Sequence, residues 1–150
     1  MNQKVNIDFG IDSDNGLLSG VKKLADAVRT TMGPGGSNVL IETNGRPILT
    51  KDGVTVARSI NLIDSLENLG AQLVKEAASG AADIAGDGTT TATVLTYELF
   101  KHGSQMINSG IDPVKLRKSL QKWSEKLEEN LLDASTPVRS NKEVMQVGTL

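Results

Sequence analysis

Three long stretches with helical periodicity, between Asp64 and Leu131, constrain the fold of this chain more than any other feature. Apolar residues recur every three or four positions in each stretch, which is the spacing of one helix face. Turns at Gly86 and Gly110 separate the stretches. The predicted apolar faces are Leu66, Leu69, Leu73, Ala77, Ala81 and Ile84; then Ala92, Leu95, Leu99 and Met106; then Leu116, Leu120, Trp123, Leu127 and Leu131.

Another helix is predicted near the N-terminus. The polar run Asp12–Asn15 offers capping side chains to a face that consists of Leu17, Leu18, Val21, Leu24, Ala25 and Val28. This helix should stop at Gly33–Gly36, because Pro34 cannot continue the hydrogen-bond ladder. A short alternating segment, Lys4–Phe9, comes before it.

A β-hairpin is predicted between Asn38 and Thr50. Two β-prone runs flank Asn44-Gly45, the dipeptide most typical of a tight hairpin turn, and Pro47 suits an edge strand. The spacing from Val54 to Leu62 allows a short helix. The predicted fold class is therefore mainly α (α+β).

The last part of the chain carries two helix starts. Asp112 has the position of an N-cap with Pro113 as the first helical residue, and Ser140 and Glu143 have the spacing of a capping box. The final residues up to Leu150 show no C-terminal capping signal, so we expect the chain to be part of a longer protein.

Composition argues against several classes of function. The 150 residues have a net charge of −2 with both signs interspersed, so no basic surface is expected to attract nucleic acid or a membrane. The absence of cysteine excludes thiol chemistry, and the single histidine, His102, cannot form a histidine-rich metal site and is expected at the surface. No signal peptide or membrane-spanning stretch is recognisable, which predicts a cytoplasmic protein.

The turn Gly86–Thr91 has the chemistry of a phosphate site. Its glycines allow close approach to the backbone, the following helix start offers free N–H groups, and three threonines add hydroxyl donors. Asp87 would repel a phosphate unless a cation such as Mg²⁺ lies between them. Lys51 could neutralise further phosphate charge, and Asp52 could position a water or a cation.

Each turn also has a plainer interpretation. Asp87 could simply cap a helix, Gly33–Gly36 could simply end one, and Lys51–Gly53 could be a solvated turn. No G-x-x-x-x-G-K-[ST] run is present, so a P-loop nucleotidase is not supported.

The turns and the segments between them resemble the group I chaperonins of the GroEL type. The motifs T-[LM]-G-P, T-K-D-G-V-[TS]-V-A-R, E-N-x-G-A-Q-x-V-K-E and A-G-D-G-T-T-T-A-T-V-L occur at Thr31–Pro34, Thr50–Arg58, Glu67–Glu76 and Ala85–Leu95. The likeness continues through Gly110–Pro113 and Val147–Thr149 and so covers nearly the whole chain. Group II chaperonins share the threonine turn, but Lys51–Arg58 is similar to the group I version, which favours the bacterial or organellar type.

The resemblance implies a site for ATP, Mg²⁺ and K⁺. Asp87 would coordinate magnesium, Lys51 would lie near the phosphates and a potassium ion, and Asp52 would be the catalytic residue that faces the attacking water. The residues expected to hold phosphate oxygens are Gly88, Thr89, Thr90 and Thr91, and those expected to line the nucleotide from the other side are Thr31, Met32, Gly33 and Pro34.

The resemblance also implies a domain assignment and partners. Residues 1–133 would be the N-terminal half of the ATP-binding equatorial domain and 134–150 the start of the intermediate domain, with the apical domain and the rest of the equatorial domain outside this sequence. The parent would be an ATP-hydrolysing chaperone subunit in a homo-oligomeric ring, acting on unfolded client proteins with a co-chaperonin. The hairpin and N-terminal strand would pair between subunits, and this chain alone should bind ATP weakly and hydrolyse it slowly or not at all.

Two departures and two alternatives accompany this interpretation. Family members usually carry Lys and Arg where this sequence has Gly35 and Ser37, which indicates a divergent member. One alternative is a short chain that binds ring subunits without hydrolysing ATP. The other is a stand-alone phosphate-binding helical module that shares only the threonine turn.

Overall fold

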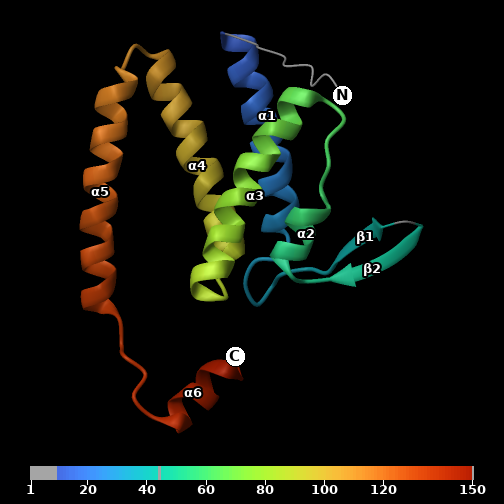
Figure 1. Cartoon of the computed structure of the whole chain (residues 1–150), viewed down its shortest axis with the longest axis vertical. Helices are drawn as coiled ribbons and strands as arrows, with labels where there is room; N and C mark the ends of the chain where they lie inside the picture. The colour runs from blue at the N-terminus through green and yellow to red at the C-terminus, as the bar shows by residue number, and fades with distance from the viewer. Residues whose placement is uncertain (1–9, 44, 150) are drawn as a thin grey trace, which may run out of the picture. The chain divides into compact units, whose positions relative to one another are not determined.

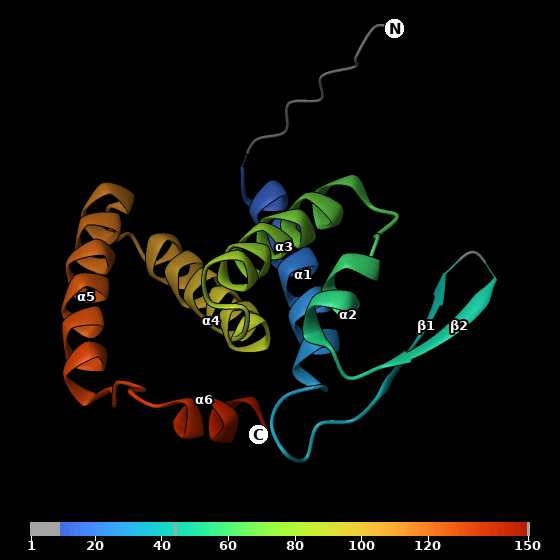
Figure 2. The same cartoon turned by 60° about the horizontal axis from the view of Figure 1, so that its bottom comes forward.

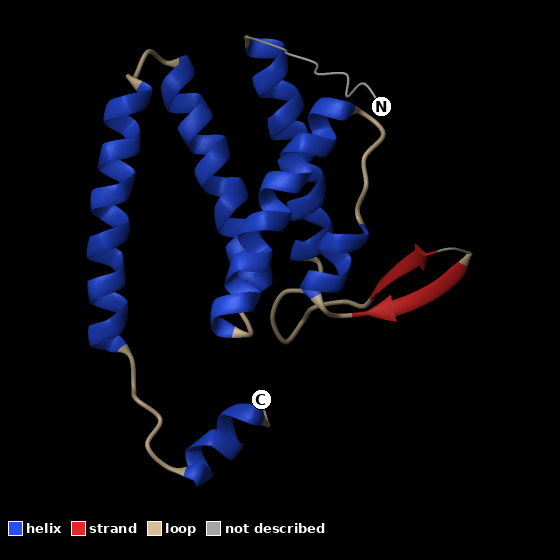
Figure 3. Ribbon diagram, in the orientation of Figure 1, coloured by secondary structure: helices blue, strands red, loops and turns tan. Residues whose placement is uncertain are grey.

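The computed structural model describes residues 10–43 and 45–149. The predicted segment Lys4–Phe9 therefore lies outside the described residues. The elements follow the chain as α1 (Ile11–Arg29), β1 (Val39–Thr43), β2 (Arg46–Thr50), α2 (Gly53–Ser59), α3 (Ser65–Ala85), α4 (Thr89–Asn108), α5 (Pro113–Ala134) and α6 (Asn141–Gly148) (Figures 1 and 3). The mainly α fold class is confirmed. The chain divides into two compact units, residues 1–108 and 109–150.

The first unit is built from three long helices that lie side by side, α1, α3 and α4, with α2 packed against all three (Figures 1 and 2). Small and branched aliphatic side chains fill its core, and Tyr97 is the one aromatic residue among the buried side chains of the described residues. The buried apolar residues are Val21, Leu24, Ala25, Val28, Ile41, Val56, Ala57, Ala71, Val74, Ala78 and Tyr97.

Glycines allow α1 and α3 to approach very closely. A methyl group on Gly20 would lie 1.8 Å from the carbonyl oxygen of Glu67, and one on Gly70 would lie 2.1 Å from that of Leu17. Both distances are far inside van der Waals contact. The backbones of the two helices therefore touch where any side chain would hold them apart.

The bounds of α1 differ from the prediction at both ends. The helix begins at Ile11 with Gly10 as N-cap and no side-chain cap, so the polar run Asp12–Asn15 lies inside the helix and the predicted capping is wrong. Its last residue is Arg29, well before Pro34. The hydroxyls of Thr30 and Thr31 donate to carbonyl oxygens of the last turn, at 2.7 and 2.8 Å, and this bonding accompanies the early stop.

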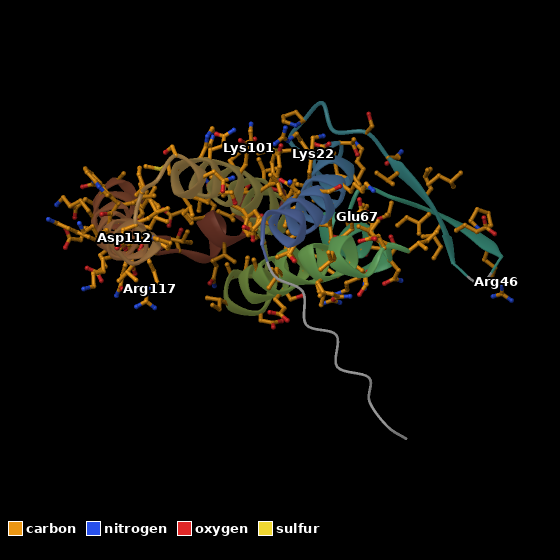
Figure 4. The ribbon with its side chains drawn as sticks, turned by 90° about the horizontal axis from the view of Figure 1, so that it is seen from above. Lys22, Arg46, Glu67, Lys101, Asp112 and Arg117 are labelled. Carbon is orange, nitrogen blue, oxygen red and sulfur yellow. The ribbon has the colours of Figure 1, made fainter. Side chains whose placement is uncertain are left out.

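The predicted hairpin is confirmed. Strands β1 and β2 form a two-stranded antiparallel sheet in which Leu40 lies opposite Leu49 and Glu42 opposite Pro47. The short helix α2 is also confirmed, although it ends at Ser59. In Figure 4, Arg46 marks the tip of the hairpin.

The predicted apolar faces of α3 and α4 are wrong. On α3, Leu69 and Leu73 are about half exposed and Ile84 is 91% exposed, whereas the buried side is formed by Gly70, Ala71, Val74 and Ala78. On α4 the core side carries Thr89, Thr93 and Tyr97, while Leu95, Leu99 and Met106 are exposed. Both helices are apolar on two sides. The side with small residues is the buried one, because small residues allow closer packing than the leucines that dominate the sequence pattern.

The second unit contains α5 and α6. The predicted caps are confirmed: the Asp112 carboxylate accepts from the N–H groups of Val114 and Lys115, and Ser140 and Glu143 form a capping box. Neither helix has a buried residue. The prediction that Trp123 belongs to a core is wrong for this chain, because its side chain is 72% exposed and the leucines of its stripe, Leu120, Leu127 and Leu131, are exposed as well.

No helix of residues 10–43 and 45–149 is long and apolar enough to cross a membrane. His102 is exposed, as expected.

Candidate functional site

The turn that follows α1 folds back on itself. The N–H of Ser37 donates to the carbonyl oxygen of Thr30 at 2.7 Å, and the N–H of Gly36 donates to that of Gly33 at 3.0 Å. Gly33 has a φ of 70°, which favours glycine. Thr31 is buried, whereas Met32, Gly33 and Pro34 are exposed. The turn thus holds one threonine inside the fold and presents the next three residues to solvent.

The second turn places Asp52 at the start of α2. Its carboxylate accepts from the N–H groups of Val54, at 3.2 Å, and Thr55, at 2.9 Å, and from the Thr55 hydroxyl at 2.5 Å. The hydrogen bond from the Thr55 hydroxyl is the main cause that lowers the pKa of Asp52 below its ordinary value. Lys51 is exposed, and no carboxylate of the described residues lies within ion-pair distance of it. Its ammonium group is therefore available to an anion.

The third turn joins α3 to α4. Gly86, with a φ of 71°, ends α3 in the left-handed conformation, and Gly88 has a φ of 80°. The first helical hydrogen bond of α4 runs from the N–H of Ala92 to the carbonyl oxygen of Gly88. The preceding N–H groups, those of Thr89–Thr91, have no acceptor among the described residues. The turn therefore presents three free donors at the positive end of a helix.

Asp87 does not cap α4. Among the described residues its Oδ1 accepts only from the N–H of Gly88, at 2.6 Å, and Asp87 is exposed. Because the carboxylate leaves the N–H groups of Thr89–Thr91 open, the geometry does not match the plain capping interpretation. The turn therefore offers one exposed carboxylate next to free N–H groups. The carboxylate suits a hard cation, and the N–H groups suit the phosphate oxygens that the same cation contacts.

The three turns converge at the hydroxyls of Thr31 and Thr90. These two oxygens are 3.5 Å apart, and either can donate to the other. Gly53 packs against the same pair, since a methyl group there would lie 2.3 Å from Thr90 Oγ1 and 3.5 Å from Thr31 Oγ1. Three residues that are far apart in the sequence thus meet at one place, and each belongs to a different turn.

A second set of contacts ties the end of α1 to α4 beside this junction. The Arg29 guanidinium donates to Glu98 Oε1 at 3.0 Å, and this hydrogen bond is the main cause that lowers the pKa of Glu98. Arg29 and Lys101 each lie 5.7 Å from the ring centre of the buried Tyr97. Lys101, on α4, and Lys22, on α1, point to the same edge of the view in Figure 4.

Two hollows of the described surface lie elsewhere. One, of about 640 Å³, is open and is lined by the loop before α3 together with Lys23 and Glu67. These two residues form an ion pair at 2.6 Å across α1 and α3, which holds the pKa of Glu67 below its ordinary value. The other lies around Trp123 on α5. No group of three or more His, Cys, Asp or Glu side chains comes together in the part of the chain that the structure describes.

Sequence reasoning missed Gly53 at the junction and Thr55 at the start of α2. The sequence predicts Gly53 only as part of a turn, because its contact with Thr90 depends on tertiary packing that no local pattern shows. Thr55 could have been found, because an aspartate followed three residues later by a hydroxyl residue at a helix start has capping spacing. The structure brings Thr31, Thr90 and Gly53 together and leaves Lys51 and Asp87 exposed at the rims of their turns.

Comparison with known proteins identifies the family of this chain. The sequence model of the TCP-1/cpn60 chaperonin family matches residues 24–149, which is most of the chain. The chain belongs to the TCP-1/cpn60 chaperonin family. The resemblance to the N-terminal portion of a GroEL-type chaperonin is confirmed.

A solved structure of the family has the same fold. The chain is similar to the chaperonin gp146 from the bacteriophage EL 2 (Pseudomonas aeruginosa), whose crystal structure was determined in the presence of ATP-BeFx. The TM-score is 0.75 and the sequence identity 30%, over 87% of this chain. The match covers 23% of the gp146 chain, so the present chain spans about a quarter of that relative's length.

Proposed function

We propose that this chain carries one part of the ATP site of a chaperonin subunit, and that the parent subunit uses ATP to assist the folding of other proteins. Membership of the chaperonin family supports the chaperone class. The observation that carries the nucleotide proposal is the convergence of the three turns at Thr31, Gly53 and Thr90. A glycine-rich helix start with free N–H groups is a suitable place for phosphate oxygens.

The residues present fit a magnesium nucleotide. The Asp87 carboxylate would hold Mg²⁺, and the N–H groups and hydroxyls of Thr89–Thr91 would hold phosphate oxygens, with Gly88 permitting close approach. When bound, the cation neutralises phosphate charge. Thr31–Pro34 would line the nucleotide from the other side, and the exposed Lys51 would face the phosphates and K⁺. Asp52 would orient the attacking water.

Calorimetric titration of the chain with ATP, in the presence of Mg²⁺ and K⁺, tests the proposal. We expect weak binding that Asp87→Ala abolishes, because the substitution removes the only carboxylate in the phosphate turn. Asp83→Ala is the matched control. Asp83 is also an exposed aspartate, lies near the end of α3 outside the turn, and should be dispensable.

Two results would contradict the proposal. Failure of the folded chain to bind ATP would show that these turns do not form a nucleotide site in this chain. Equal binding by the Asp87→Ala and Asp83→Ala variants would show that the nucleotide binds elsewhere. Circular dichroism of each variant separates loss of binding from loss of fold.

A second candidate function rests on the hairpin. Among the described residues each strand of the sheet has one neighbour, and the paired residues Leu40 and Leu49 are 69% and 65% exposed. An uncovered sheet of this kind can pair with another chain. A chain that joins chaperonin rings through this hairpin without hydrolysing ATP would co-migrate with a ring on size-exclusion chromatography, and Leu40→Pro would abolish the co-migration.

The remaining features of the parent are proposals that follow from the family. Residues 1–133 would form the N-terminal half of the equatorial domain and 134–150 the start of the intermediate domain. The parent would assemble into a homo-oligomeric ring, bind unfolded proteins and work with a co-chaperonin. Its cytoplasmic location stays a prediction from the sequence.

A further inference from the structure

The Asp52 carboxylate is held more tightly than helix capping requires. Two backbone N–H groups, those of Val54 and Thr55, already satisfy the start of α2. The Thr55 hydroxyl adds a third hydrogen bond, at 2.5 Å to Asp52 Oδ2. The main chain is fixed as well, because the N–H of Asp52 donates to the Thr50 hydroxyl at 3.0 Å. One rotamer of Asp52 is thereby favoured over the others.

This fixed carboxylate lies next to the junction of the three turns. Asp52 directly precedes Gly53, whose α-carbon packs against the hydroxyl of Thr90. Thr90 carries one of the free N–H groups at the start of α4. The orientation of Asp52 is therefore set within one residue of the place where phosphate oxygens would bind.

The hydrogen bonds also determine what the carboxylate can do. The Thr55 hydroxyl, followed by the N–H groups of Thr55 and Val54, lowers the pKa of Asp52, while partial burial opposes this effect. The positive charge of Arg58 acts in the same direction as the hydrogen bonds. A carboxylate with a lowered pKa is a poor proton acceptor near neutral pH, although it still accepts a hydrogen bond.

We propose that Thr55 is a positioning residue of the nucleotide site, whose hydroxyl locks Asp52 in one orientation so that Asp52 orients the attacking water without removing its proton. The inference rests on the proposed function, because it requires Mg-ATP in the three turns. In the step itself, the water oxygen bonds to the γ-phosphorus and the bond to the bridging oxygen breaks. The electron pair leaves with ADP, and the water proton passes to a phosphate oxygen.

Substitution of Thr55 tests the inference in the 150-residue chain. Thr55→Val removes the hydroxyl at nearly constant shape, and Thr55→Ser keeps it. Thr96→Val is the matched control, since within the described part of the chain the Thr96 hydroxyl bonds only to the carbonyl oxygen of Ala92 in α4. The measurements are the dissociation constant of Mg-ATP, the rate of a single ATP turnover as a function of pH, and the melting temperature.

We expect Thr55→Val to slow the turnover roughly tenfold to a hundredfold, which is the range for a misplaced group. Its Mg-ATP dissociation constant should stay within about twofold, because binding and reaction depend on different contacts. Loss of the hydroxyl raises the pKa of Asp52, so the fall in rate on acidification should begin at a higher pH than in the unsubstituted chain. Thr55→Ser should restore the rate and the pH profile, and Thr96→Val should change neither.

Other outcomes overturn the inference, and they separate it from the proposed function. If the unsubstituted chain binds Mg-ATP but Thr55→Val turns it over at the original rate, Thr55 positions nothing and the nucleotide site stands. The inference requires at least slow turnover by this chain, so a chain that binds Mg-ATP without any turnover contradicts it, because Asp52 then orients no reacting water. Parallel losses of rate, affinity and melting temperature would indicate a purely structural residue. Absence of Mg-ATP binding in the unsubstituted chain removes both the inference and the proposed function.

Discussion

At the scale of single residues, Gly53 determines how closely α2 approaches the start of α4. The space that a side chain would need is occupied by Thr90 Oγ1, and Val28 and Thr31 lie just behind it. The residue is buried in the first turn of α2 and not in a strained loop. Its role is therefore steric, and the conformational freedom of glycine is not required.

Gly53→Ala should destabilise the chain by about 1–3 kcal/mol, because the added methyl group forces α2 away from Thr90. Urea denaturation measures this change. Gly80→Ala is the control: Gly80 lies inside α3, and no neighbouring atom lies within 4 Å of the position that its methyl group would take. Alanine there should stabilise the helix by about 0.5–1 kcal/mol. Equal effects of the two substitutions would contradict the steric role of Gly53.

Asp52 should make the stability of the chain depend on pH in the acidic range. Its pKa is lowered in the folded state from the ordinary value of 3.8. The unfolded chain therefore binds a proton at a higher pH than the folded chain does, and stability falls as the pH decreases from 3.8 through the folded-state pKa. The contribution of Asp52 is fully present above that window.

Asp52→Asn should lower the free energy of unfolding at neutral pH and flatten its decline in acid. Urea denaturation at a series of pH values measures both effects. Asp83→Asn provides the reference, since the exposed Asp83 side chain forms no hydrogen bond or ion pair with the described residues and should leave the profile unchanged. Parallel acid profiles for the unsubstituted and Asp52→Asn chains would show that the hydrogen bonds to Asp52 add no stability.

At the scale of elements, local chemistry predicted the starts of α3, α5 and α6 better than the helix faces, although it failed at both ends of α1. The starts at Asp64, Asp112 and Ser140 depend on side chains that reach two or three residues along the chain, so the sequence contains all that is needed. The buried face depends on which neighbour packs against the helix. Helix α3 is apolar on two sides, and periodicity predicted that the side with its leucines is buried. In the structure α1 packs instead against the side with Gly70, Ala71 and Val74.

The neighbouring residues Leu73 and Val74 test this assignment. Val74→Ala should cost about 2 kcal/mol, because Val74 has no exposed surface and the lost methyl groups leave a cavity. Leu73→Ala should change the free energy of unfolding by less than about 0.5 kcal/mol, since half of the larger side chain is already in solvent. The periodic pattern predicts instead that Leu73→Ala costs more stability than Val74→Ala. Denaturation of both variants shows which of the two assignments of the buried face is correct.

At the scale of the whole molecule, the two units should differ in local stability. The first has a common core from α1 to α4, whereas α5 and α6 have no buried residue. Most of the stability of a helix in a protein comes from tertiary packing of its apolar face, and neither α5 nor α6 has such packing among the described residues. Amide hydrogen exchange should therefore be slowest around Val21, Leu24 and Val28, and at least roughly a hundredfold faster in α5. Similar protection in both units would show that α5 is packed in solution.

The candidate site could be predicted only in part from the sequence. The glycines and threonines of Gly86–Thr91 indicated phosphate chemistry because free helix N–H groups follow from local geometry. Nothing local indicated that Thr31 and Thr90 would meet, since their contact depends on the packing of α1 against α4. Periodicity predicts a core position for Leu69, Leu95 and Trp123, but these residues are exposed. A pattern of apolar residues alone does not show whether another surface covers them.

The distribution of the core along the chain has a consequence for biosynthesis. Among the described residues of the first unit, every buried apolar side chain lies between Val21 and Tyr97, and the last residue of the unit is Asn108. Synthesis proceeds at about 5–20 residues per second, so the following 42 residues, 109–150, take roughly 2–8 seconds to add. The core of the first unit can therefore form while α5 and α6 are still being synthesised.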